Sequence, residues 1–338
     1  MMTFVGSAIV RRLMAFCAGM VLALGGPASS AQPPRLEKFV LAGWSKPITE
    51  ITHLLAEPDM GFFKDQGLAL TYLPGAGGGD ALRNLLSGQA EVAFTDPGSF
   101  FAALDKGAEL RAIYDIYPQN VFNVVALASS GITRPADLKG KRIGVYSLVS
   151  GTRQNLQILL QHAGLNESDV TIVVTGVLNF APLIRGQVDA TAATDTGLAL
   201  ARRRGLGDVQ VIEVADYLNY SSDLFVVRES YYQQNKDTLR RFLAAYRRSA
   251  EWMISEPERA AQVAQRRAID GQDPVLNAEI IAIRNRASVS ALTQKRGLGA
   301  LDLETLQAAA DAYFDLGLIS RRITISDAAA LDVLPDAQ

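Results

Sequence analysis

The sequence predicts an α/β fold in two lobes, each a mixed sheet flanked by helices, with a two-strand hinge between them. Three observations lead to this prediction. Strand-like and helix-like segments alternate in two successive series, which is typical of a sheet with helices on both faces. Two strongly apolar, strand-like runs flank the second series. Four helical segments follow the second run, as expected if the chain returns to the first lobe.

The first 31 residues are predicted to be a secretory signal peptide. Arg11 and Arg12 precede an apolar run from Leu13 to Leu24, and residues 28–31 supply small side chains at a cleavage point. The run is shorter than the roughly 20 residues that a membrane-spanning helix needs. We expect cleavage after Ala31 and a periplasmic protein; the alternative is an N-terminal anchor helix that stays attached.

Composition then limits the classes of function. Removing 31 of 338 residues leaves 307, enough for two domains. Without Arg11 and Arg12, 31 Lys and Arg stand against 35 Asp and Glu, and a net charge of −4 disfavours a nucleic-acid partner. The only cysteine, Cys17, lies in the predicted signal peptide, and His53 and His162 are 109 residues apart. We therefore expect no disulfide, thiol nucleophile, metal site or cofactor.

The first series of elements runs from the start of the mature chain to Pro97. Ile48, Ile51 and Leu54 follow helical spacing after the first strand. Asp96 before Pro97 is typical of a helix N-terminus. The predicted elements are strands at 38–44, 68–73 and 90–94, helices at about 47–57 and at 81–87, a helical turn at 61–68 and a glycine-rich loop at 74–80.

The second series lies between the runs 121–128 and 223–227, which are predicted to cross between the lobes. The first lobe is then 35–123 plus 228–338, and the second is 124–227. Such crossings make a cleft with a hinge. The predicted elements are strands at 142–146, 170–174 and 188–193, helices at 152–163 and about 180–186, and later helices at 235–255, 257–267, 277–288 and 303–316.

A short pattern occurs once in each series. A helix end, Gly-Gln, an apolar residue and an acid occupy 86–91 and 184–189, before strands that end in Thr95-Asp96 and Thr194-Asp195. Either the two lobes share a structural unit here, or the similarity is coincidental, since glycine commonly follows a helix.

Three stretches also resemble a known family: 56–68 with its Gly-Phe-Phe and Gln-Gly-Leu, 78–93, and 135–145 with Asp-Leu-Lys-Gly-Lys. Over nearly all its mature length the chain resembles periplasmic substrate-binding proteins of ABC importers, in the group that binds alkanesulfonates, taurine, nitrate and thiamine-pyrimidine precursors. The resemblance implies the type II periplasmic binding fold. It also implies a monomer without catalytic activity that captures a small organic solute in the interlobe cleft and delivers it to an ABC permease.

Two other functions fit the same fold. One is an enzyme of the same fold, such as the eukaryotic pyrimidine-precursor synthases that resemble these transporters, but those use cysteine-rich and histidine motifs that this mature chain lacks. An extracytoplasmic sensor is the third possibility, and it would need a membrane helix joined to a signalling domain. The predicted signal peptide favours the binding protein over a cytosolic enzyme.

One loop is the main candidate for contact with a solute. It leaves a strand and enters a helix, so its hydroxyls and the positive end of the helix dipole can hold an anion. The alternative is ordinary helix capping by serine or threonine. The resemblance matches this loop to the family's ligand loop in the second lobe. The candidate residues in it are Tyr146, Ser147, Ser150, Gly151 and Thr152.

Further candidates lie where other strands end. Trp44 would stack on a flat solute or pack in a core, and Gly78 belongs to a loop whose amides can approach an anion. Asp96 and Asp195 would accept hydrogen bonds from amines or cap helices. Asn123, on the first crossing, and Thr175, at a strand end, complete the set.

The nature of the solute stays open between a pyrimidine-like or aromatic compound and a sulfonate. No Arg or Lys is placed at a strand end, and Arg153 is the nearest cation to the candidate loop. Trp44, Tyr146 and the two aspartates favour an uncharged or amine-bearing ring.

Overall fold

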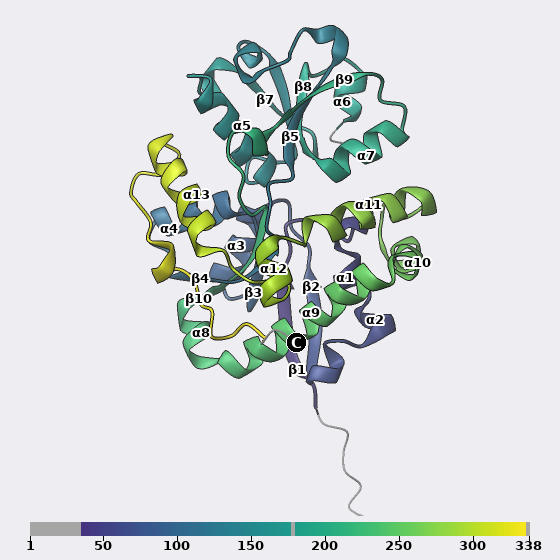
Figure 1. Cartoon of the computed structure of the whole chain (residues 1–338), viewed down its shortest axis with the longest axis vertical. Helices are drawn as coiled ribbons and strands as arrows, with labels where there is room; N and C mark the ends of the chain where they lie inside the picture. Colours follow the sequence, from purple (N-terminus) through teal and green to yellow (C-terminus); the bar gives the residue numbers. More distant parts are fainter. Residues whose placement is uncertain (1–34, 177–179, 336–338) are drawn as a thin grey trace, which may run out of the picture. The chain divides into compact units, whose positions relative to one another are not determined.

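The computed structural model describes residues 35–176 and 180–335, which build two five-stranded sheets (Figure 1). The predicted signal peptide, 1–31, lies outside the described residues. Sheet A has the order β2-β1-β3-β10-β4, and sheet B has the order β7-β6-β8-β5-β9. The strands are β1 (Glu37–Ala42), β2 (Leu68–Leu73), β3 (Val92–Thr95), β4 (Leu110–Tyr117), β5 (Phe122–Leu127), β6 (Arg142–Val145), β7 (Thr171–Val174), β8 (Ala190–Thr194), β9 (Val209–Glu213) and β10 (Asp223–Arg228).

The two sheets have the same topology. In sheet A, β1 runs parallel to β2 and β3, and β10 runs antiparallel to β3 and β4. In sheet B, β6 runs parallel to β7 and β8, and β5 runs antiparallel to β8 and β9. These mixed sheets, with helices packed on them, confirm the predicted fold class.

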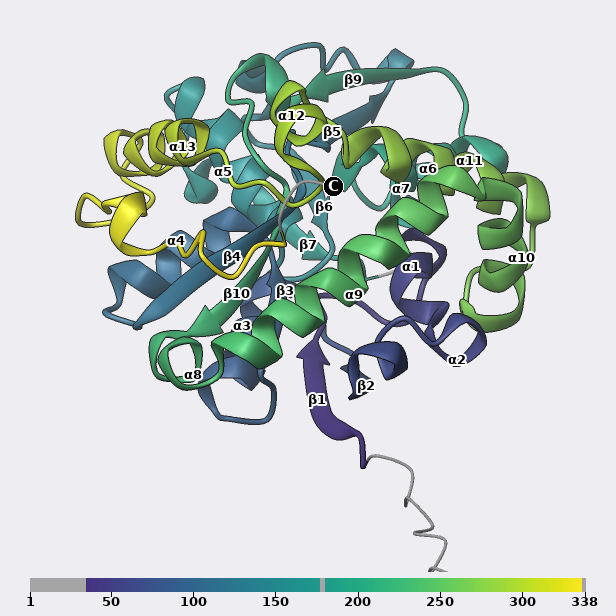
Figure 2. The same ribbon diagram turned by 60° about the horizontal axis from the view of Figure 1, so that its bottom comes forward.

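Helices join the strands and continue after β10. Figure 2 shows the long helix α9 running across the side of sheet A near β3 and β10, with α10 and α11 following it. The helices are α1 (Thr52–Leu55), α2 (Glu57–Met60), α3 (Gly78–Leu86), α4 (Pro97–Asp105), α5 (Gly151–His162), α6 (Ala181–Ile184), α7 (Asp195–Arg203), α8 (Glu229–Gln234), α9 (Lys236–Ser255), α10 (Pro257–Arg267), α11 (Pro274–Ala287), α12 (Ala291–Arg296) and α13 (Leu303–Asp315), with a 3-10 turn at Thr49–Ile51.

The chain crosses between the sheets through two short segments, 118–121 and 214–222. They lie side by side, because the backbone N–H of Asn120 donates to Asn219 Oδ1 at 3.0 Å and that of Val121 donates to Ser222 Oγ at 3.2 Å. The two runs predicted to be strand-like are strands β5 and β10, each held between two antiparallel partners. We refer to 35–117 with 223–335 as the sheet A half and to 122–213 as the sheet B half; the predicted lobe boundaries stay a prediction.

Most other predicted elements are present with shifted ends, and the strand at 68–73 and the helix at 257–267 have the predicted bounds. The helix predicted at about 47–57 is divided into shorter turns. Pro58 lies in the first turn of α2, where its missing N–H is tolerated, so this segment starts a separate helix. The helix predicted at 81–87 begins earlier, at Gly78, which therefore lies in a helical turn and not in a loop. The sequence prediction missed β4, β9, α7, α8 and α12.

Aromatic side chains fill the space between sheet A and α9. The Phe225 and Tyr246 ring centroids are 4.5 Å apart, and those of Phe39 and Phe242 are 4.6 Å apart. All four side chains are buried. Such contacts fix the strand ends of sheet A, on which the candidate site is built.

The repeated pattern occupies the same place in both sheets. Gly88 lies between α3 and β3, and Gly186 lies between α6 and β8, both with positive φ, of 78° and 66°. Thr95 pairs with Leu224 of β10, and Thr194 pairs with Phe122 of β5, so β3 and β8 are equivalent strands. The similarity therefore reflects a shared structural unit.

Candidate functional site

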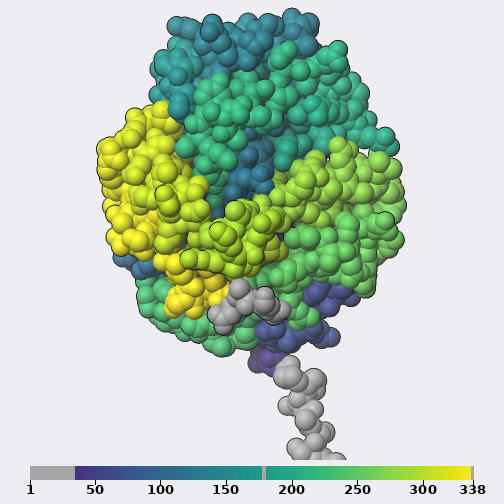
Figure 3. Space-filling view, in the orientation of Figure 1, coloured from purple at the N-terminus to yellow at the C-terminus, as the bar shows by residue number. Residues whose placement is uncertain are grey.

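A cavity of about 370 Å³ lies between the two halves. Figure 3 shows the surface recessed where the teal atoms of the sheet B half meet the yellow-green atoms of α11 and α12. The volume is within the usual range for small-molecule sites. The lining residues from the sheet A half are Trp44, Ile48, Glu50, Gly77, Gly78, Asp96, Asp223, Ile269, Asp270 and Ile280. Those from the crossing and the sheet B half are Val121, Phe122, Tyr146, Ser150, Gly151, Thr152, Gly176, Phe180, Ala181, Ile184, Thr194, Thr196, Gly197, Leu200, Ala201 and Arg204.

Seven of the sequence-predicted site residues lie together on this lining: Trp44, Gly78, Asp96, Tyr146, Ser150, Gly151 and Thr152.

The other four predicted residues, Asn123, Ser147, Thr175 and Asp195, do not line the cavity. Asn123 follows the lining residue Phe122 on β5, and neighbouring side chains on a strand point to opposite faces. Ser147 Oγ donates to the carbonyl of Ala76, and Thr175 Oγ1 donates to the carbonyl of Val145 at 3.0 Å. Asp195 pairs with Arg284.

The sheet A wall of the cavity is acidic. Glu50, Asp96 and Asp223 are each less than a tenth exposed, and Asp270 also lines the wall. Burial raises the pKa of Asp223 well above its usual range, and the nearby carboxylates of Asp96 and Glu50 raise it further. Within residues 35–176 and 180–335, no side chain or backbone group pairs with the Asp223 carboxylate. The wall therefore presents a carboxyl group that is free to form hydrogen bonds in the cavity.

Asp96 combines the two roles that the sequence left open. It is the N-cap of α4, because Oδ1 accepts a hydrogen bond from the Ser99 N–H and Oδ2 accepts one from Ser99 Oγ, both at 2.8 Å. It also lines the cavity. Burial raises its pKa, and the hydrogen bonds from Ser99 oppose that shift.

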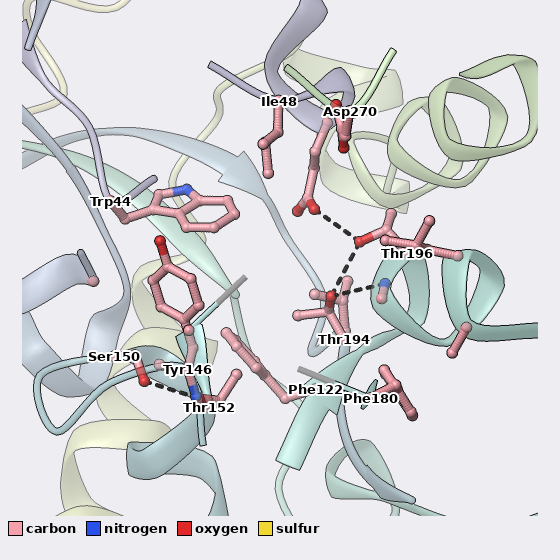
Figure 4. Close-up of a pocket in the computed structure, with 18 of the residues that line it drawn as sticks. Trp44, Ile48, Phe122, Tyr146, Ser150, Thr152, Phe180, Thr194, Thr196 and Asp270 are labelled. Atoms are coloured by element: carbon pink, nitrogen blue, oxygen red, sulfur yellow. Dashed lines mark hydrogen bonds between the residues drawn. The ribbon is translucent and has the colours of Figure 1, made fainter. Parts of the chain in front are cut away.

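The sheet B wall carries aromatic rings and hydroxyl groups. Figure 4 shows Tyr146 beneath Trp44, with its hydroxyl directed at the indole, while Phe122 and Phe180 lie towards the opposite side of the cavity from Trp44. Thr194 and Thr196 lie at the start of α7, with their hydroxyl oxygens 3.0 Å apart. Flat apolar surface therefore faces the carboxylates of the other wall.

The hydroxyls of the candidate loop already have partners within the loop. Ser150 Oγ donates to the carbonyl of Ser147 at 2.7 Å, and it lies 2.8 Å from Thr152 Oγ1. Thr152 Oγ1 accepts a hydrogen bond from the Tyr146 N–H at 3.0 Å. These bonds hold the loop before α5 together, and Ser150, although it is the N-cap residue of α5, makes no side-chain hydrogen bond to the first turn of the helix.

The glycine-rich segment contacts this loop across the cleft. Gly79 N–H donates to the carbonyl of Val149 at 3.0 Å, and Gly77 N–H donates to the carbonyl of Trp44 at 2.7 Å. Gly77 has φ of 130°, and a Cβ atom there would come within 2.4 Å of the Val149 oxygen. A Cβ on Gly78 would come within 2.1 Å of Asp96 Oδ2. Glycine is therefore needed for close approach, and two of the amides proposed for an anion are already used.

Arg284 is the cation that the sequence prediction missed. It lies on α11 behind the wall, has no exposed side-chain surface, and places Nε 2.8 Å from Glu50 Oε1. Burial alone would lower its pKa, but Asp195 and Glu50 raise it above the ordinary value. Arg153, the cation nearest to the loop in sequence, pairs instead with Glu167 at 2.6 Å.

For the other lining residues that the prediction missed, the sequence indicated the element to which each belongs but not that its side chain faces the cavity. Phe122 and Asp223 belong to the two runs recognised as strands, but which of their side chains face the cleft depends on register. Glu50 lies inside the segment predicted as one continuous helix. The site therefore depends on pairings between distant segments.

In the described part of the chain, no helix is long and apolar enough to cross a membrane. Among the same residues, no group of three or more His, Cys, Asp or Glu side chains is arranged to hold a metal ion.

Sequence comparisons place this chain among known proteins. The family described as "NMT1/THI5 like" matches residues 48–260, more than half of the chain. The 4-amino-5-hydroxymethyl-2-methylpyrimidine phosphate synthase of Aspergillus parasiticus is 25% identical over 59% of this chain and 62% of its own length. The formylaminopyrimidine-binding protein of Halalkalibacterium halodurans is 23% identical over 63% of this chain and 65% of its own. The riboflavin-binding protein RibY of Chloroflexus aurantiacus is 22% identical over 91% of this chain and 89% of its own length. The chain thus spans less than two thirds of the first two relatives.

Solved structures share the fold. The alkanesulfonate-binding protein SsuA of Xanthomonas axonopodis pv. citri, bound to MOPS, superposes with a TM-score of 0.70 at 17% identity, covering 89% of this chain and all of that one. The periplasmic aliphatic sulphonate binding protein SsuA of Escherichia coli gives a TM-score of 0.62 at 19% identity, covering 86% and 97%. At these identities the likeness concerns the fold alone.

Proposed function

Because the chain belongs to the NMT1/THI5-like family, we propose that it is the solute-binding component of an ABC importer and captures a small organic solute between its two halves. Two of the relatives are named as binding proteins for small heterocycles, and the fold is that of periplasmic binding proteins. A cavity between two lobes buries most of a small solute, which gives affinity without chemical reaction.

We propose that the solute is a flat, uncharged or amine-bearing heteroaromatic compound, such as a pyrimidine. The observation that carries this proposal is the unpaired Asp223 carboxylate beside Glu50 and Asp96 on one wall. N–H groups of the solute would satisfy these acceptors, and its ring would lie against Trp44 and Tyr146. A sulfonate would instead place its negative charge near several carboxylates.

The alternative is an enzyme related to pyrimidine-precursor synthases, because three relatives have that name. The described histidines argue for binding only, since neither lines the cavity. His53 is buried against Tyr246, with 2.9 Å between Nε2 and the hydroxyl, and burial lowers its pKa to about 3. His162, the last residue of α5, packs against Tyr217. Cys17, the one cysteine, belongs to the predicted signal peptide.

The same proposal includes the cellular location in which the protein works. We propose that the N-terminal segment directs export, that the protein works as a monomer in the periplasm, and that an ABC permease in the inner membrane receives the solute. The fold-level likeness to periplasmic sulfonate-binding proteins supports this placement.

A thermal-shift screen followed by calorimetry tests the proposed function. The panel contains aminopyrimidines, riboflavin, alkanesulfonates and aromatic acids, each added to the purified protein. We expect a rise in melting temperature with an amine-bearing heteroaromatic, since a solute that binds only the folded state stabilises it. A rise with sulfonates alone would contradict the proposed solute class. Conversion of a pyrimidine precursor, measured by mass spectrometry, would support the enzyme.

A further inference from the structure

Arg284 is joined to both halves of the molecule by polar contacts. Its guanidinium forms ion pairs with Glu50, at 2.8 Å, and with Asp195. Its Nη2 also donates to Thr196 Oγ1 at 3.1 Å. The guanidinium lies 5.1 Å from the centroid of the Tyr117 ring. It does not line the cavity, so its contacts are with the protein and not with a solute site.

These contacts form a ring that crosses the cleft. Glu50 and Arg284 belong to the sheet A half, whereas Asp195 and Thr196 are the first two residues of α7 in the sheet B half. Thr196 Oγ1 donates to Glu50 Oε2 at 2.7 Å, so each of the two sheet B residues bonds to the other half. We call these four side chains the Arg284 ring.

The sheet B side of the Arg284 ring is held rigidly. The backbone N–H of Asp195 donates to the carbonyl of Val121, in the first crossing segment, at 3.1 Å. Thr194 caps α7, accepting a hydrogen bond from the Gly197 N–H at 3.3 Å. Asp195 is thus tied to the first crossing segment as well as to Arg284, and because Arg284 belongs to the other half, a movement that parts the halves lengthens the distance between Asp195 and the guanidinium.

The balance of charge and solvation favours contact between the halves. Glu50 and Arg284 lie in the same half, so the free-energy cost of removing these two charged groups from water arises only in part from closure of the cleft. Asp195 keeps 36% of its side chain exposed, which limits its desolvation, and it gains a fully buried cation. Opening leaves Arg284 with one carboxylate partner in place of two.

We propose that Arg284 is a positioning residue that links Glu50, on the cavity wall, to closure of the cleft, so that the Arg284 ring stabilises the closed arrangement without a bound solute. The inference rests on the proposed function only for the premise that solute enters between the halves. A partly closed population would reduce the rate of solute entry and raise affinity once the solute is inside, because less free energy is then needed to close.

Pulsed electron–electron double resonance, which measures the distance between two spin labels, tests this proposal on the full chain in the absence of solute. A Cys17→Ser background carries spin labels at Lys64→Cys and Lys139→Cys, exposed positions in the sheet A and sheet B halves. We expect a short-distance population in the parent protein. Asp195→Asn should lower the ratio of the short-distance to the long-distance population about tenfold, and Arg284→Gln should act in the same direction.

Arg203→Gln is the matched control. Arg203 on α7 pairs with Asp273 beside α11 at 2.7 Å, which also joins the two halves, but both side chains are substantially exposed. Exposed pairs contribute little, so we expect less than about a twofold change.

Two outcomes would overturn the proposal: a parent protein with only the long distance, or an Asp195→Asn distribution equal to that of the parent. If Arg284→Gln fails to fold by circular dichroism, Asp195→Asn decides, since its side chain is partly exposed. Solute binding is measured separately by calorimetry. Failure of every solute to bind would count against the proposed function and leave the ring test unchanged.

Discussion

The two halves of this protein have the same strand topology but bring different chemistry to the cavity between them. The sheet A wall supplies four carboxylates, from Glu50, Asp96, Asp223 and Asp270. The sheet B wall supplies three aromatic rings and five hydroxyls, one of them on Tyr146, with one cation, Arg204, among its lining residues. Equivalent scaffolds can thus carry different chemistry, with the carboxyl groups on one wall and three of the four lining aromatic rings on the other, while Trp44 adds the fourth ring from the sheet A half.

The equivalent strand ends show how small a change produces this difference. Thr95-Asp96 and Thr194-Asp195 end β3 and β8, the third strands of their series. In sheet A, Asp96 caps the following helix and faces the cavity. In sheet B, Thr194 caps the helix one position earlier, and Asp195 turns to Arg284. Asp195, which is equivalent to Asp96, therefore forms an ion pair between the halves and does not face the cavity.

The largest expected effect comes from removing the unpaired acceptor of the sheet A wall. Asp223→Asn should weaken binding of an aminopyrimidine about 10- to 100-fold, because an NH2 group, which can only donate, replaces a carboxyl oxygen that can accept a hydrogen bond from the solute. The fold should not suffer, since burial already disfavours the charged form of Asp223. Calorimetry measures the affinity, with Asp208→Asn, an exposed carboxylate in the other half, as the control. Equal losses in both variants would remove the distinction between the walls.

The sheet B wall should respond to loss of ring area and not to loss of a polar atom. Tyr146→Leu should weaken binding about tenfold, because the flat contact with the solute is reduced. Tyr146→Phe, which keeps the ring, should stay within about twofold of the parent. The comparison is measured by fluorescence titration or calorimetry. A larger loss in Tyr146→Phe than in Tyr146→Leu would show that this wall acts through hydrogen bonding.

A smaller effect concerns the stability of the sheet A half, which should depend on pH through one buried carboxyl group. Asp115, on β4 of sheet A, is buried with Ser221 Oγ donating to it at 2.6 Å, and burial raises its pKa to about 8 from a usual value near 3.8. The folded state therefore holds this proton more tightly than the unfolded state. Its contribution to stability is fully present below pH 4 and is lost as pH rises through 8.

Asp115→Asn should accordingly match the parent protein near pH 4 and exceed its unfolding free energy by about 1–2 kcal/mol near pH 9. Urea denaturation at the two pH values measures the difference. A parallel pH dependence in both proteins would mean that Asp115 is not protonated in the fold.

The smallest effect is expected at Ser150. Its hydroxyl already donates to the Ser147 carbonyl, so Ser150→Ala should change solute affinity less than about twofold and cost about 0.5–1 kcal/mol of stability. Thermal denaturation and calorimetry measure the two quantities. A tenfold loss of affinity at unchanged stability would show that the start of α5 holds the solute directly.

The sequence was informative where local patterning decides the structure. The helix at 257–267, the cap at Asp96 and the loop at 146–152 follow from periodicity, proline position and hydroxyl placement over a few residues. Seven lining residues were identified in this way, because strand ends followed by helices can be recognised locally.

What the sequence did not reveal depends on contacts over long separations. Arg284 lies in the middle of a predicted helix, and its partners Glu50 and Asp195 are more than 80 residues away. Asn123 was placed at the cleft, but the register of β5 turns Phe122 there instead. Register and charge pairing are set by the assembled sheets, which no local pattern encodes.

The most direct test of the account is a crystal structure of the protein with a bound aminopyrimidine. We predict that the exocyclic amine lies about 3 Å from the Asp223 carboxylate, with the ring against Trp44 and Tyr146. An amine directed away from the sheet A carboxyl groups, towards the start of α5 or the solvent, would contradict the claim that these carboxyl groups recognise the solute.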